Sequence, residues 1–230
     1  YKQYYSANLM KLVVLGRESL DELEAMVVPR FEIIANSDVE IKPHVDRLIP
    51  AERLPLVIEF KPLKEMRELS LSFQLPKMRP HWRVKPAGYL GGVIGHEGQG
   101  SLVQVLKDRG LIESLSAGLG LEDRSSSLFS IDIGLTPEGF AQRDQIVEML
   151  FAWIEKLRAD GLQEWRYNEQ AKMLDIAFRF QEKQSPMGYV SSLAGMMQQY
   201  PVADVLQAGY MMQDWDQKLV SQTLSALTPL

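Results

Sequence analysis

The sequence predicts an α+β fold in which helices cover one face of a mostly antiparallel sheet. Residues 67–75, 111–119 and 128–135 alternate apolar and polar side chains, so each is expected to be a strand with one buried face. Residues 136–159 carry apolar side chains on one side of a long helix that Gly161 ends. Most strands precede most helices, which is typical of two layers, a half-polar sheet and its helical cover.

Composition indicates a globular protein and excludes several functions. Of the 230 residues, 46% are hydrophobic and 24% are charged, as in ordinary globular domains. The net charge of −5 leaves no basic surplus for nucleic acid. No apolar run is long enough to cross a membrane, and no signal-peptide pattern is present. Without cysteines there is no disulfide or thiolate chemistry, and the compartment stays open between bacterial periplasm and cytoplasm.

The first residues resemble the end of another domain. Residues 7–16 form a short apolar run that predicts a buried strand, and Ser19 and Glu22 form a capping box that starts a helix. Pro29 is expected to end or kink that helix. A strand without a partner exposes backbone groups, so if the chain forms a homodimer, we expect the strand near Met10 to be its cause.

Three segments follow from this interpretation. Residues 1–36 are expected to close a preceding domain, and residues 37–55 are expected to form a linker because Pro43, Pro50 and Pro55 recur there. Residues 56–230 form the second and main domain. The sequence as a whole looks like a piece of a longer polypeptide.

Within the main domain, further elements follow in order. Residues 56–63 predict a strand, residues 86–94 a helix, and residues 122–127 a hairpin turn. Later helices are expected at residues 163–181 and 188–199.

The glycine-rich loop at residues 95–101 is the most distinctive stretch. Three glycines within six residues disfavour a helix, and Ser101 is suited to cap the next helix, which Gly110 ends. Such a loop exposes backbone groups that can recognise an extended peptide or an anion. It is equally typical of a tight corner between two helices, and local sequence leaves both open.

No complete active site is apparent. The three histidines, His44, His81 and His96, lack the spacing of three or four residues that places zinc ligands on one helix face. The chain has no Gly-x-Ser-x-Gly elbow, and its glycine loop lacks the Gly-Lys-Ser/Thr ending of a phosphate loop. We therefore expect no catalytic residue, metal or cofactor in this chain.

Several motifs resemble the pitrilysin/insulin-degrading-enzyme (insulinase) family of zinc metallopeptidases. The similarity runs through the chain in order and matches the end of the family's first domain and its second, non-catalytic domain. The motifs are Tyr4-Tyr5-Ser6-Ala7-Asn8-Leu9-Met10, Val14-Leu15-Gly16-Arg17-Glu18-Ser19-Leu20-Asp21-Glu22-Leu23, Tyr89-Leu90 through Ile94-Gly95-His96-Glu97-Gly98-Gln99-Gly100-Ser101-Leu102 with Leu106-Lys107 and Gly110, Leu135-Thr136-Pro137-Glu138-Gly139, Leu157-Arg158-Ala159-Asp160-Gly161-Leu162-Gln163-Glu164-Trp165 and Ala177-Phe178-Arg179-Phe180.

The resemblance implies an α/β roll with about six strands backed by helices. It also implies a parent metalloendopeptidase whose catalytic zinc lies in another domain, because the family's His-x-x-Glu-His motif is absent from this chain. The partners it implies are a peptide substrate and the other domains of the same polypeptide.

The resemblance further implies an exosite that holds the N-terminus of a peptide substrate. Gly95 and Glu97 would lie on its loop, and Leu115 and Ala117 on its strand. Ala117 stands where insulin-degrading enzymes carry a glycine, which indicates altered selectivity; Gly92 and Leu119 depart from the pattern too, replacing a histidine and a glutamine. Two alternatives remain: a loop that only braces the domain, and a structural or assembly module from a catalytically inactive family member.

Overall fold

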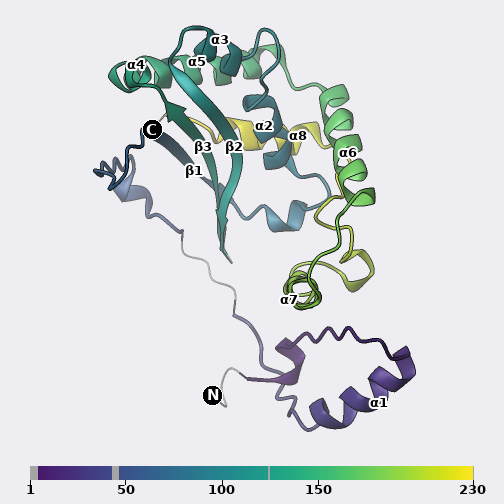
Figure 1. Ribbon diagram of the computed structural model, residues 1–230. Helices are drawn as coiled ribbons and strands as arrows, with labels where there is room; N and C mark the ends of the chain where they lie inside the picture. Colours follow the sequence, from purple (N-terminus) through teal and green to yellow (C-terminus); the bar gives the residue numbers. More distant parts are fainter. Residues whose placement is uncertain (1–4, 43–46, 124, 230) are drawn as a thin grey trace. The chain divides into compact units, whose positions relative to one another are not determined.

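A computed structural model describes residues 5–42, 47–123 and 125–229 (Figure 1). Tyr4 of the N-terminal motif, Pro43 of the expected linker and His44 lie outside the described residues. The chain forms two compact units: residues 1–43 with 176–210, and residues 44–175 with 211–230. The boundaries expected at residues 36 and 55 remain a prediction.

The larger unit is built on an antiparallel sheet. Its strands are β1 (Glu68–Pro76), β2 (Ile112–Glu122) and β3 (Ser126–Leu135), in the order β1-β3-β2. Phe73 pairs with Phe129 across β1 and β3, and Ala117 pairs with Ile131 across β2 and β3. The three alternating segments are therefore strands, as predicted, and the last two form a hairpin.

The alternation along β3 separates an apolar face from a polar one. Phe129, Ile131, Ile133 and Leu135 are almost completely buried. On the other face, Ser72 and Ser130 hydroxyls lie 3.0 Å apart, and Ser70 donates to Asp132. One covered and one polar face explain the two-layer fold.

The helices of the larger unit supply the second layer. In Figure 1, α2 and α8 lie behind the sheet and α5 crosses its upper end. Ile146, Leu150 and Ile154 recur every four residues along α5 and are fully buried. The helices are α2 (Pro86–Ile94), α3 (Leu102–Asp108), α4 (Pro137–Ala141), α5 (Arg143–Asp160), α6 (Glu164–Arg179), whose last residues belong to the smaller unit, and α8 (Gln217–Ser225), with 3-10 turns at Ala51–Arg53 and Arg79–His81.

Two expectations about strands need correction. Among the described residues the sheet has three strands, whereas the resemblance implied about six. The strand expected at residues 56–63 does not form, and Val57, Ile58 and Phe60 are 73–80% exposed. An alternating or apolar run becomes a strand only where another strand takes up its backbone hydrogen bonds. No described segment pairs with this one.

The predicted helix start at Thr136 is confirmed, although the helix is interrupted. Thr136 Oγ1 accepts from Gly139 N at 2.9 Å and caps α4. At Gln142 the backbone leaves helical geometry, with φ −109° and ψ 25°, before α5 begins. One long predicted helix is therefore two.

The smaller unit contains α1 (Leu20–Phe31), α7 (Pro186–Met196) and 3-10 turns at Ala7–Leu9 and Val202–Asp204. The capping box of Ser19 and Glu22 is confirmed, and Pro29 lies inside α1, two residues before its end. The strand predicted at residues 7–16 is wrong: Ala7–Leu9 form a 3-10 turn, and residues 10–16 form no strand. The homodimer inferred from that strand loses its structural basis.

Candidate functional site

The glycine loop connects α2 to α3 through a sharp corner. Gly95 caps α2, and its N–H donates to the carbonyl of Gly91 at 2.9 Å. Gly100 adopts φ +79°, a left-handed conformation that favours glycine. Ser101 then caps α3 by accepting from Gln104 N at 3.1 Å. The helix–loop–helix arrangement predicted from sequence is confirmed.

Glycines let α2 approach the backbone of β2 closely. An ideal Cβ placed on Gly91 would lie 2.4 Å from the carbonyl oxygen of Ala117, far inside van der Waals contact. One placed on Gly95 would lie 3.9 Å from Ala117 N. The loop therefore begins directly beside the middle of β2, and α2, the loop and this part of the strand form one surface.

Strand β2 becomes more exposed along its length. Leu115 is 6% exposed and belongs to the core, Ala117 is half-buried, and Leu119 and Leu121 are 44% and 53% exposed. Leu115, Ala117 and Leu119 share the face of Ile133, Ile131 and Phe129, and a register shift after Leu119 places Leu121 opposite Leu128. Within the described residues β2 pairs only with β3, so its other edge carries no strand. A free edge and exposed leucines are features that an extended peptide can use.

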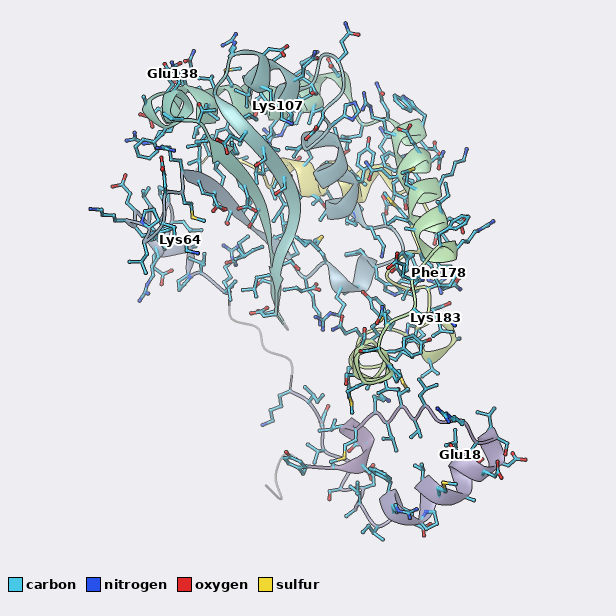
Figure 2. All side chains as sticks on the ribbon, in the orientation of Figure 1. Glu18, Lys64, Lys107, Glu138, Phe178 and Lys183 are labelled. Atoms are coloured by element: carbon cyan, nitrogen blue, oxygen red, sulfur yellow. The ribbon has the colours of Figure 1, made fainter. Side chains whose placement is uncertain are left out.

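The carboxylate of Glu97 is held by a lysine. Lys107, in the last turn of α3, places its Nζ 3.1 Å from Glu97 Oε1 (Figure 2 labels Lys107). The two side chains are 36% and 64% exposed, so the pair is open to solvent and weak. Sequence reasoning did not assign Lys107 a role, because a pair ten residues apart across a glycine loop has no local pattern.

The four predicted site residues therefore differ in what they can offer a ligand. Gly95 and Ala117 are neighbours, and Glu97 follows two residues later on the loop. The side chain of Leu115 is in the core, so Leu115 can offer a ligand only its backbone. Their assignment to substrate binding remains a prediction.

Lys85, at the N-terminal end of α2, is electrostatically unusual. Its backbone is left-handed, with φ 49°, and its Nζ donates to the carbonyl of Trp82 at 3.0 Å. Burial lowers the pKa of Lys85 to about 8.

In the described part of the chain, no group of three or more His, Asp or Glu side chains is placed to hold a metal ion. No helix of the described ranges has the length and apolarity to cross a membrane.

Comparison with known proteins identifies the family. The profile described as "Peptidase M16 inactive domain" matches residues 1–174, and that described as "Middle or third domain of peptidase_M16" matches residues 178–230. The chain belongs to the M16 (insulinase) peptidase family. The predicted resemblance is thus confirmed.

Individual relatives of this M16 chain are similar over its whole length. It is 37% identical over 229 residues to insulin-degrading enzyme of Homo sapiens and 36% identical over 231 residues to the A-factor-processing enzyme of Saccharomyces cerevisiae, and it covers 22% of each. The crystal structure of pitrilysin matches 99% of the chain with a TM-score of 0.95 and 30% identity, and the chain covers 24% of it. The M16 chain therefore spans about a fifth to a quarter of these relatives.

Proposed function

We propose that this M16 chain is a non-catalytic, substrate-binding part of a zinc metalloendopeptidase. It would shape the chamber of the parent enzyme and hold the N-terminus of a peptide while zinc bound elsewhere in the polypeptide performs hydrolysis. Holding the substrate converts a bimolecular encounter into an oriented one, which accelerates the distant chemical step.

The observation that carries this proposal is the junction of the glycine loop with β2. Bare backbone at Gly95 lies beside Ala117, and the carboxylate of Glu97 stands two residues further along the loop. A peptide strand can lie along the free edge of β2, and its terminal ammonium can bind a carboxylate. Support also comes from the family match, which is to an inactive peptidase domain.

The ion pair with Lys107 gives a second reason to propose that Glu97 binds the terminal ammonium of a peptide. The carboxylate of Glu97 already binds one primary ammonium, that of Lys107, at 3.1 Å. Glu97 is thus able to hold a primary ammonium in this environment. A peptide would bind by displacing Lys107 or sharing the carboxylate with it.

The test is a titration with a short peptide bearing a free N-terminus and with the same peptide acetylated. We expect the free peptide to bind more tightly, and Glu97→Gln to remove the difference. Glu138→Gln, a change of an exposed carboxylate on α4, is the matched control and should leave the difference intact.

Equal binding of the two peptides to the unaltered chain would overturn the ammonium role of Glu97. No binding of either would favour a bracing loop or an assembly module. Because an α-amino group loses its proton near pH 8, the preference for the free peptide should also disappear above about pH 9.

A further inference from the structure

Helix α2 and strand β2 run in opposite directions where they touch. An ideal Cβ on Gly95 would lie 3.9 Å from Ala117 N, whereas one on Gly91 would lie 2.4 Å from the carbonyl oxygen of Ala117 and 3.3 Å from the Cα of Gly118. Moving back along α2 from the glycine loop therefore means moving forward along β2. A peptide that leaves the loop toward the exposed end of β2 passes alongside α2.

A glutamine of α6 lies against the exposed backbone of α2. Gly88 and Gly92 are the exposed positions of α2, so the helix presents no side chain on that side. An ideal Cβ on Gly92 would lie 2.3 Å from Gln170 Nε2 and 3.0 Å from Gln170 Oε1. The carboxamide of Gln170 is therefore in direct contact with bare helix backbone, on the side of α2 that faces α6 (Figure 1).

One hydrogen bond orients this carboxamide and leaves its oxygen available. Gln170 Nε2 donates to the carbonyl of Tyr89 at 3.3 Å, which requires the amide nitrogen on the helix side. In the described part of the chain, Gln170 Oε1 accepts no hydrogen bond, and it is not one of the polar atoms buried without a partner. The oxygen is therefore accessible to solvent, and a carboxamide oxygen can accept two hydrogen bonds.

We propose that Gln170 is a further binding residue of the peptide site, whose Oε1 accepts a hydrogen bond from a backbone N–H of the bound peptide. This inference rests on the peptide site proposed above. Gly92 precedes Gly95 by about 4.5 Å along the helix axis, and an extended peptide advances about 3.3 Å per residue. A peptide whose ammonium is at Glu97 would bring one of its residues two to four to Gln170. Proline has no backbone N–H, so the contact would disfavour peptides with proline at that residue.

The test uses peptides that differ in one backbone N–H. A short alanine peptide with a free N-terminus is compared, by calorimetric titration, with versions N-methylated at residue two, three or four. Each is titrated into the unaltered chain and into Gln170→Met, which keeps the length and helix propensity of the side chain but removes the amide oxygen. We expect N-methylation at one of these residues to weaken binding to the unaltered chain about two- to tenfold, and to have no such effect on Gln170→Met.

Gln145→Met, at an exposed glutamine of α5, is the matched control and should respond to N-methylation as the unaltered chain does. If every N-methylated peptide loses the same affinity for Gln170→Met as for the unaltered chain, the role of Gln170 is overturned. The peptide site itself would then stand on its sensitivity to acetylation and to Glu97→Gln. Failure of the unaltered chain to bind the unmethylated peptide would overturn the proposed function and this inference together.

Discussion

Lys85 shows how burial of one charge sets a pH dependence of stability. Its pKa falls to about 8 in the folded chain, from an ordinary value of 10.5, because burial penalises the ammonium form. Between these two pH values the unfolded chain binds more protons than the folded chain. The free energy of unfolding must therefore rise with pH in this window.

We predict that this rise is lost in Lys85→Met. Relative to the variant, the unaltered chain should gain about 1 kcal/mol between pH 7.5 and pH 10, a value discounted for the partial exposure of the side chain. Urea unfolding followed by tryptophan fluorescence measures it, and all four tryptophans lie in the larger unit. Parallel pH profiles for the two proteins would refute the burial of this charge.

Lys107 is expected to compete with a peptide ammonium for the carboxylate of Glu97. Because its ammonium holds the carboxylate at 3.1 Å, Lys107→Met should leave Glu97 free for a peptide ammonium. Exposed ion pairs contribute about 0.2–1 kcal/mol, so affinity for a free-N-terminus peptide should rise by a factor of about 1.4 to 5, with no change for the acetylated peptide.

Calorimetric titration measures this change. Lys156→Met is the matched control, since it breaks another exposed lysine–carboxylate pair, at 2.7 Å, within α5. An unchanged or weaker affinity of Lys107→Met for the free peptide would mean that Glu97 and Lys107 do not compete for it.

At the scale of elements, the close approach of α2 to β2 positions the loop. Gly91→Ala would place a methyl group at 2.4 Å from the Ala117 carbonyl oxygen, so the helix must move away. We predict a loss of about 1–3 kcal/mol in the free energy of unfolding. The same variant should weaken peptide binding, because the loop would leave the strand.

Gly88→Ala is the control on the same helix. Its Cβ would lie 3.5 Å from the Cβ of Lys85, an ordinary contact, and alanine favours a helix by up to about 1 kcal/mol. Equal stability of the two variants in urea would show that α2 does not need a glycine against β2.

Some helices and strands could be predicted from the sequence, and others could not. The caps at Ser19, Ser101 and Thr136 and the alternation of the three strands were predictable, because each depends on residues within one element. Residues 7–16 and 56–63 were mistaken for strands, since a strand exists only with a partner and periodicity does not reveal one.

For the molecule as a whole, the family and the layer architecture were predictable and the long-range chemistry was not. The resemblance named the glycine loop and β2 as candidates. It did not show that Leu115 is in the core or that Lys107 binds Glu97. Those arrangements depend on how distant elements pack, which local patterns do not encode.

The central claim is that a peptide N-terminus binds where the glycine loop meets β2. A peptide carrying a nitroxide near its free N-terminus tests this most directly, through paramagnetic broadening of backbone amide resonances. We predict that Gly98, Gly100 and Gly118 broaden most. Broadening spread evenly over the chain, or concentrated away from the loop and β2, would contradict the proposed site.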